Sequence, residues 1–404
     1  MNHQILKSPA PLSAGAIIYS LLPFILILFL GYLTIGLPLA VLPLYMHDYL
    51  GLSPVTIGWV MASQSMATLL TRPLSGVVTD VRGSKPAVFM GLLFCSLAAV
   101  TYGGSVWVKE IPSMALILLF IGRAILGFGE SLLITGILAW CMAIVGARHT
   151  GQAMVWVGIA MFSAIGSGAP MGVVLLKWGG FERMVVIAAI LPLLACFSVK
   201  FMKPIPPVRD VRLSFFAVVG EIWSYGSSLA LSTIGFGAMF AFLGLDYAAH
   251  HWTSASFGLT AFGLSYVAVR LVFGGLPDRL GGLRVARVTI PLQIMGLILL
   301  WLASSSWVAF IGCAVLGGGY SLTFPALGVE AVRSIPPQNR GAAMGAYVAF
   351  VDIGLGLAGP SAGLVASNFG YPSVFFMGAC ASFLAMIFIF GLSQKQQNIE
   401  DVQP

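Results

Sequence analysis

Three ionisable residues lie inside stretches that are otherwise apolar, where each could take part in proton exchange. Arg123 stands ten residues into the apolar run 113–144, ~15 Å along a helix, and Glu130 follows seven residues later on the same helix face. Asp352 stands eleven residues after Gly341, at a similar depth by the same helical rise. A charge in the middle of a membrane span costs about 2.5 to 3.5 kcal/mol, so we expect all three to face one central cavity.

Arg123 and Glu130 have two interpretations, which the sequence leaves open. Apolar surroundings favour the neutral carboxyl group and a nearby arginine favours the ionised one, so Glu130 would be poised to exchange a proton as solvent access alternates. The other interpretation is a static buried pair that only orients its helix, because such pairs can be neutral for stability. In both, Gly127 leaves space between the two side chains.

The composition requires a membrane protein around these residues. Hydrophobic residues make up 59% of the chain and only 8% of residues are charged, whereas soluble domains are about 25% charged. Apolar stretches long enough to cross a ~30 Å hydrocarbon core follow one another, and each must be helical to satisfy its own backbone. The sequence therefore predicts an all-α membrane protein with twelve transmembrane helices, at 18–45, 54–78, 86–107, 113–144, 151–176, 183–201, 217–245, 254–276, 285–304, 306–330, 341–367 and 372–393.

A polar segment divides these helices into two groups of six. Lys200 to Arg212, "KFMKPIPPVRDVR", holds three prolines and five charged residues, which is typical of a linker. We predict a first six-helix bundle at 1–199, a cytoplasmic linker at 200–216 and a second six-helix bundle at 217–404.

The basic residues are unevenly distributed among the predicted loops. With both termini inside, fourteen of the twenty Lys and Arg residues fall in inner loops, three in outer loops and three within spans. The positive-inside rule then places both termini in the cytoplasm. Because topology accounts for the net charge of +7, we predict no nucleic-acid partner.

A charged motif occurs twice at a fixed distance. "RPLSGVVTDVRG" begins at Arg72, and "RLVFGGLPDRLG" begins 198 residues later at Arg270. The shared positions are Arg72 and Arg270, Gly76 and Gly274, Asp80 and Asp278, and Gly83 and Gly281. Positions 190 residues apart also match, at Gly127 and Gly317, Gly129 and Gly319, Ser131 and Ser321, Gly151 and Gly341, Met154 and Met344, and Pro170 and Pro360. The chain is therefore predicted to be two copies of one unit, a pattern typical of transporter folds.

The repeated glycines have predicted structural tasks. Gly76 and Gly274 would let helices pack tightly, and Gly83 and Gly281 would turn the chain in a short connection.

The repeated charges divide into two kinds. Asp80 and Arg82 lie in the loop itself, where the alternative is that they are only solvated charges. Arg72 and Arg270 lie within spans, ~12 Å from the inner surface. We expect a structural or gating role for both, in preference to substrate contact, because long side chains can reach towards an interface.

Other candidate motifs are interpreted as structural. "GLGLAG", 354–359, has the dinucleotide-binding pattern but lies deep in an apolar span, where glycines permit close helix approach. His250 and His251 are neighbours that do not share a helix face, so we expect no metal site. The cysteines are expected to pack in the core, with no disulfide, metal or other cofactor: Cys95, Cys141, Cys196, Cys313 and Cys380.

The chain resembles the major facilitator superfamily, specifically its bacterial sugar-efflux-like and drug-efflux-like permeases. The resemblance covers nearly the whole chain, in "GYLTIGLPLAVLPLY", the two Asp loops, "GRAILGFGESLLITG", "LTFPALGVEAV" and "RGAAMGAY". In that family a loop of the form Gly-x-x-x-Asp-Arg-x-Gly latches the two halves in one state. Asp278, Arg279 and Gly281 match it, whereas the first copy differs, with Val81 beside Asp80 and the arginine at 82.

Further family features concern coupling and export. Proton-coupled members carry Arg-x-x-x-Gly-x-Gly, matched by Arg123, Gly127 and Gly129, so the resemblance implies proton coupling. "GSGAPMG", with Pro170, resembles the Gly-Pro element of the antiporters, and Pro360 follows Gly359 in a better copy. A proline kink among small packing residues is the alternative for both.

We therefore expect a monomeric, proton-coupled, alternating-access carrier in the bacterial inner membrane, with the lipid bilayer, a small organic solute and a proton as its partners. Export is our first choice, with Glu130 and Asp352 as proton acceptors, Arg123 modulating them and the Asp loops as latches. The exported solute would be a sugar, a drug or a metabolite. Uptake by proton symport and export of a siderophore or metabolite are the alternatives, and a non-transporting membrane sensor is the alternative of another class; no enzyme is expected. The cavity walls are predicted from depth alone as Tyr32, Gln64, Phe236, Tyr320 and Gln293.

Overall fold

The computed structural model describes residues 14–146, 149–205, 215–252, 255–333, 335 and 340–400, and these parts of the chain are helical without a strand. The elements are α1 (Ala14–Leu39), α2 (Leu42–Leu44), the π-helical turn η1 (Tyr45–Tyr49), α3 (Pro54–Arg82), α4 (Ser84–Trp107), α5 (Pro112–Val145), α6 (Thr150–Lys200), α7 (Phe215–Ala249), α8 (Ala255–Phe273), α9 (Leu276–Leu280), α10 (Gly282–Trp301), α11 (Ser306–Arg333), α12 (Arg340–Phe369) and α13 (Pro372–Glu400).

Every predicted crossing helix has a counterpart. Within the described residues, ten helices are long and apolar enough to span a membrane, by length and composition. One of them, α6, contains two spans, because the backbone is non-helical at Gly179 and Gly180, where φ is 74° at the second glycine. The remaining crossing helix is α3, which is more polar because it carries Gln64, Arg72 and Asp80. The first predicted helix, 18–45, extends too far, because α1 ends at Leu39.

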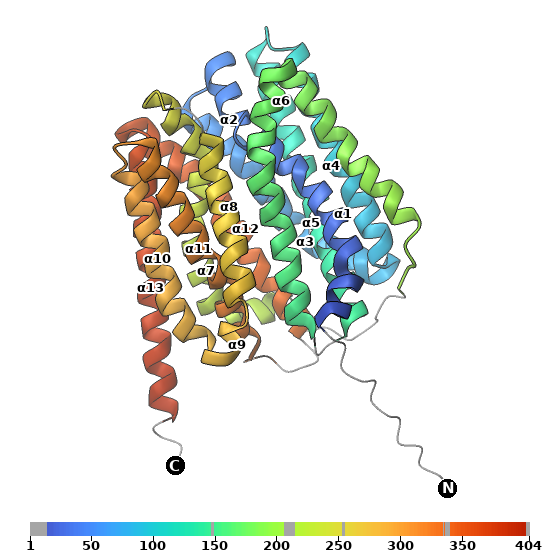
Figure 1. The fold of residues 1–404 in the computed structure, drawn as a ribbon, viewed down its shortest axis with the longest axis vertical. Coiled ribbons are helices and arrows are strands. Elements are labelled where there is room, and N and C mark those ends of the chain that lie inside the picture. The colour runs from blue at the N-terminus through green and yellow to red at the C-terminus, as the bar shows by residue number, and fades with distance from the viewer. Residues whose placement is uncertain are drawn as a thin grey trace.

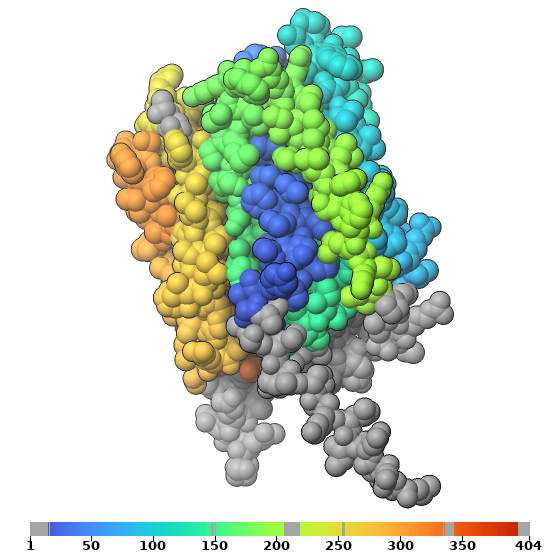
Figure 2. Space-filling model, turned by 45° about the vertical axis from the view of Figure 1, so that its right-hand side comes forward, coloured from blue at the N-terminus to red at the C-terminus, as the bar shows by residue number. Residues whose placement is uncertain are grey.

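The long helices stand side by side in two groups (Figure 1). In the first group α1 packs on α6 and α4 on α5; in the second α7 packs on α12 and α13, and α10 on α11. The ends of α1 and α13 at Ala14 and Glu400 lie at the bottom of Figure 1, which we call the N/C end. Figure 2 shows the blue-to-green first half beside the yellow-to-orange second half. The break between α6 and α7 falls in the predicted linker 200–216, of which residues 206–214 lie outside the described residues.

The two halves meet through α3 with α12 and through α6 with α8. A Cβ added to Gly58 of α3 would lie 2.1 Å from the carbonyl oxygen of Gly359 in α12, and one added to Gly166 of α6 would lie 3.1 Å from the Cα of Gly263 in α8. Small residues let helix backbones approach this closely in a membrane. The contact of Gly58 with Gly359 lies near the start of α3 and thus towards the end of the molecule opposite the N/C end.

The outside of the bundle is apolar. Leu70, Val272 and Phe369 are among many large side chains that are mostly exposed, as expected of a surface in contact with lipid tails. Four cysteines are buried as predicted, but Cys380 is exposed, so its expected place in the core is wrong. It lies on α13, which packs on α7, α10 and α12.

Candidate functional site

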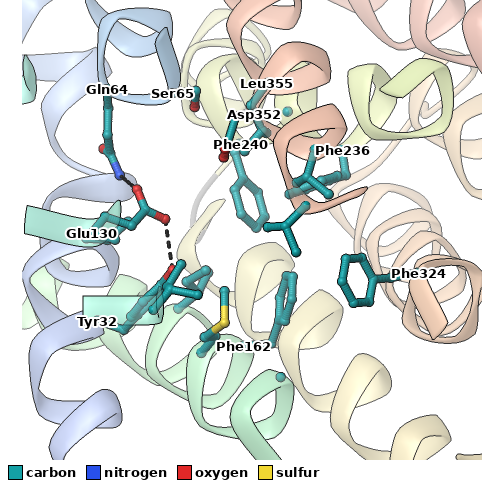
Figure 3. Close-up of a pocket in the computed structure, with 18 of the residues that line it drawn as sticks. Tyr32, Gln64, Ser65, Glu130, Phe162, Phe236, Phe240, Phe324, Asp352 and Leu355 are labelled. Carbon is teal, nitrogen blue, oxygen red and sulfur yellow. Dashed lines mark hydrogen bonds between the residues drawn. The ribbon is translucent and has the colours of Figure 1, made fainter. Parts of the chain in front are cut away.

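A central cavity of about 190 Å³ lies between the two halves and is lined by both (Figure 3). Arg123, Glu130 and Asp352, predicted to share a cavity, all line it. So do Arg72 and Arg270, for which substrate contact was not expected. The cavity therefore collects charges from α3, α5, α8 and α12.

Glu130 of α5 faces the cavity among neutral donors. The Tyr32 hydroxyl of α1 donates to its Oε1 at 2.8 Å, and the Gln64 amide of α3 donates to its Oε2 at 2.7 Å (Figure 3). The Thr68 hydroxyl lies 3.4 Å from the same Oε2. The side chain is half-buried, and within the described parts of the chain it forms no ion pair. Its carboxyl oxygens therefore accept hydrogen bonds from neutral groups only and border the cavity.

Arg123 does not pair with Glu130. Its guanidinium is buried and donates from Nη2 to the carbonyl oxygen of Met61 at 3.0 Å, while Nε and Nη1 have no hydrogen-bond partner among the described residues. Gly127 does not act as a spacer between the two side chains either. A Cβ there would lie 2.1 Å from the Gln64 carbonyl oxygen, so this glycine lets α5 approach α3.

Asp352 pairs with Arg72 across the two halves. The guanidinium Nη2 donates to Oδ1 at 3.1 Å and Nε contacts Oδ2, a two-point geometry in which both side chains are buried. Such bidentate pairs are strong and directional. Counting residues along the helices placed Arg72 and Asp352 within the membrane spans. Their pairing was not predicted, because nothing in the sequence indicates that α3 packs on α12.

Arg270 of α8 is buried, with 3% of its surface exposed. Its Nη2 donates to the Tyr266 hydroxyl at 2.5 Å, and its guanidinium lies 5.1 Å from the centre of the same ring. Nε has no partner among the described residues. This arginine has no carboxylate partner in the described parts of the chain, in contrast to Arg72.

Aromatic rings form the wall opposite Glu130 (Figure 3). Phe162 of α6 stacks on Tyr266 of α8 with ring centres 3.8 Å apart. The ring centres of Phe236 and Tyr320 are 4.3 Å apart. Of the predicted wall residues, Tyr32, Gln64, Phe236 and Tyr320 line the cavity. Phe162, Phe240, Tyr266 and Phe324 were missed, because an aromatic residue in an apolar span has the same sequence signal as a core residue.

The prediction that Gln293 lines the cavity is wrong. Its depth in α10 is suitable, but the side chain is fully buried inside the second half, where it donates to the Thr323 hydroxyl of α11 at 2.7 Å. Depth fixes the level of a residue in a helix but not the face on which it lies.

A larger cavity of about 1100 Å³ lies towards the N/C end, lined by His149, Asp278 and Arg333 among others. Four residues line both cavities and form the boundary between them, which we call the throat: Met154, Arg270, Phe324 and Met344. The halves are therefore apart at the N/C end and in close contact at the opposite end.

The two repeated loops adopt the predicted turns. Gly83 and Gly281 have φ of 92° and 88°, a region that favours glycine. A Cβ on Gly274 would lie 2.4 Å from the Arg270 carbonyl oxygen, where α8 ends. The tight packing predicted at Gly76 is wrong, because, among the described residues, a Cβ added there would have no atom of another helix within 4 Å.

The loop charges have different surroundings. Arg82, Asp278 and Arg279 are exposed, and Asp80 is half-buried. The second loop is anchored by Glu330 of α11, a buried residue that the sequence reasoning missed. Its Oε1 accepts from the Gly282 amide at 2.7 Å, directly after the turn.

The remaining predicted residues pack helices together. A Cβ on Gly129 of α5 would lie 2.8 Å from the Gly91 carbonyl oxygen of α4. Pro170 and Pro360 lie within α6 and α12, respectively.

His250 lies 3.5 Å from a carboxylate oxygen of Asp246, four residues earlier. In the described part of the chain no three potential ligands gather at a metal site.

Comparisons with known proteins agree with this architecture. The family model described as "Major Facilitator Superfamily" matches residues 24–245 and 225–401. The chain is 41% identical to the uncharacterized MFS-type transporter YhhS of Escherichia coli over 370 residues, 91% of each chain. It is 40% identical over 393 residues to an uncharacterized MFS-type transporter of Burkholderia pseudomallei, covering 97% of this chain and 96% of the relative.

Solved structures share the fold at low sequence identity. The nucleoside transporter NupG aligns with a TM-score of 0.72 at 17% identity, covering 92% of this chain and 99% of NupG. The human organic anion transporter MFSD10 aligns with a TM-score of 0.71 at 16% identity, covering 91% of this chain and 98% of the other.

Proposed function

Because the chain belongs to the major facilitator superfamily and is therefore a secondary transporter of a solute, we propose that it couples the movement of a small organic solute to protons, with Glu130 as the proton acceptor. The proposed location is the bacterial inner membrane, and the proposed unit is a monomer. The repeated Asp loops are proposed to latch the halves.

The surroundings of Glu130 support the proposal. Its carboxylate faces the cavity, and the three donors around it are neutral. Hydrogen bonds from these donors hold the carboxyl group at the cavity surface. A carboxyl group that is open to the cavity can change its protonation state as the cavity opens to either side.

Asp352 has a different proposed role from Glu130. Its bidentate contact with Arg72 ties α3 to α12. We propose that this pair holds the halves together at cavity level, and that Arg123 adds a fixed positive charge below the surface of the same cavity.

Two directions of transport are compatible with this site. Export in exchange for protons is the direction that the efflux-like resemblance implies. Uptake together with protons is favoured by the charges: Arg72 is balanced by Asp352, which among the described residues leaves Arg123 and Arg270 lining the cavity with the single acid Glu130. A negatively charged solute would be repelled by ionised Glu130 and would bind better after its protonation, so that proton and solute would travel in one complex.

Everted membrane vesicles containing the full chain test both coupling and direction. An imposed pH gradient is followed with a fluorescent weak base while arabinose, benzoate or benzylammonium is added. Dissipation of an acid-inside gradient by one solute, beyond that in vesicles without the chain, supports exchange. Proton movement driven by an imposed gradient of the solute itself, in the same direction as the solute and greater than in vesicles without the chain, supports symport. A Glu130→Gln protein with unchanged dependence on the pH gradient would refute Glu130 as the acceptor.

A further inference from the structure

Arg270 is a buried cation without an acidic partner in the described structure. Its contacts are the Tyr266 hydroxyl at 2.5 Å and the face of the same ring. A charge within a span costs about 2.5 to 3.5 kcal/mol and is normally paired or turned towards a water-filled cavity. Arg270 lies in the throat and therefore borders both cavities.

The internal repeat shows what is missing at this position. The register of 198 residues relates Arg270 to Arg72, and the register of 190 residues relates Asp352, the partner of Arg72, to Phe162. The α3–α12 interface thus has an arginine with its carboxylate. The equivalent α6–α8 interface has the arginine, with a phenylalanine in place of the acid.

The contacts of α6 and α8 agree with this equivalence. Phe162 stacks on Tyr266, the residue that holds the Arg270 guanidinium. One turn before Phe162, a Cβ on Gly158 would lie 3.0 Å from the Arg270 Nη2. The helix that faces Arg270 is therefore α6, just as α12 faces Arg72.

We propose that the missing carboxylate is supplied by the solute: the transported molecule is a small organic anion, with a carboxylate or similar group on an apolar body, and Arg270 binds its charge. This inference rests on the proposed function, since it names the solute of the same cavity. A guanidinium binds carboxylates in a two-point geometry. Phe162, Tyr266 and Phe324 supply apolar and aromatic surface for the body. The cavity of about 190 Å³ is smaller than the roughly 300 to 1,000 Å³ of drug-sized sites, which favours a small molecule.

The other charges around the two cavities define the expected pH dependence. Glu130 and the Arg72–Asp352 pair line the central cavity with Arg123, and His149, Asp278 and Arg333 line the larger one. Arg333 is in turn paired with Glu330 at 3.3 Å. Ionised Glu130 opposes a bound anion, so binding is expected to be tighter at low pH, and this favours symport of proton and anion.

The first experiment needs no solute. Phe162→Asp introduces the acid that the repeat lacks, and Phe162→Asn is the matched neutral control. Thermal unfolding of the full chain in detergent at neutral pH should give a Tm at least about 2 °C higher for the aspartate than for the asparagine. When Arg270→Gln is combined with each of these substitutions, the aspartate protein should have the lower Tm of the two. An aspartate variant no more stable than the asparagine variant would overturn the claim that Arg270 lacks a partner.

The second experiment uses three probes with one ring and different charge: benzoate, benzamide and benzylammonium. Benzoate should raise the Tm of the wild type. The increase should be smaller in Phe162→Asn, which keeps Arg270 but loses one ring of the apolar surface, and it should be lost in Arg270→Gln and in Phe162→Asp. Stabilisation by benzylammonium without benzoate would overturn the inference in favour of a cation bound at Glu130. No response of the wild type to benzoate, or an equal response of Arg270→Gln, would overturn it as well.

These results are distinguishable from a failure of the proposed function. If Glu130→Gln kept full proton coupling, the proposed role of Glu130 would be refuted, whereas the Phe162 comparison and the benzoate shift would be unaffected.

Discussion

Arg72 of α3 and Asp352 of α12 form a buried bidentate ion pair that connects the two halves of the molecule at the level of the central cavity. The two residues belong to different copies of the repeated unit. Their contact is therefore one that must change if the two copies move relative to each other.

Removing one partner of this pair should be more harmful than removing both. Asp352→Asn leaves Arg72 buried without a counter-charge, and we expect a loss of about 3 to 5 kcal/mol in unfolding free energy. Thermal or denaturant unfolding in detergent measures the loss. The double variant Arg72→Met with Asp352→Leu should recover most of it, and equal destabilisation of the single and double variants would contradict the assignment.

Replacing Glu130 by a residue that cannot ionise should make transport independent of a pH gradient. Glu130→Gln keeps the size of the side chain but cannot ionise, so solute exchange should continue while its dependence on a pH gradient is lost. Transport in proteoliposomes, with and without an imposed gradient, measures the effect. Tyr32→Phe removes the donor to Oε1 at 2.8 Å but leaves the carboxyl group of Glu130 in place, so the dependence on a pH gradient should persist in this variant.

Two glycines of α3 provide a matched comparison. A Cβ on Gly58 would lie 2.1 Å from a backbone oxygen of α12, so Gly58→Ala should force the halves apart at the end opposite the N/C end. Gly76→Ala meets open space and should be neutral or stabilise the helix by about 0.5 to 1 kcal/mol. Transport rate and Tm of both variants test this. A Gly76→Ala protein as impaired as Gly58→Ala would contradict the packing at this interface.

The carboxylate of Glu330 should anchor the second repeated loop. Glu330→Ala leaves the Gly282 amide at the start of α10 without its acceptor, which should cost about 1 to 3 kcal/mol. Glu330→Gln keeps an acceptor oxygen and should cost less. Hydrogen exchange of residues 276–285 measures the effect locally, and identical exchange in all three proteins would rule out the anchor.

Depth along the helices could be predicted from the sequence, and this accounts for most of the correct expectations. Counting residues placed Arg123, Glu130 and Asp352 at one level, and all three line the same cavity. The repeat predicted two similar halves, and the left-handed turns at Gly83 and Gly281 agree with it.

The helix face on which a residue lies, and the contacts between the two halves, could not be predicted in the same way. Arg123 donates a hydrogen bond to a backbone carbonyl and does not pair with Glu130. Gln293 points towards α11 and not into the cavity. Arg72 and Asp352 are 280 residues apart, and only the packing of α3 on α12 brings them together. A nearly uniform apolar composition gives little amphipathic signal, because lipid and core select the same side chains.

The same separation has a consequence for biogenesis. The ribosome completes the 280 residues between the two partners in about 14 to 56 s at 5 to 20 residues per second. During that time α3, the most polar of the crossing helices, is in the membrane with a cation whose counter-charge has not been synthesised. Its retention until α12 arrives must therefore depend on its earlier neighbours, above all α5, whose Gly127 lets the two backbones touch.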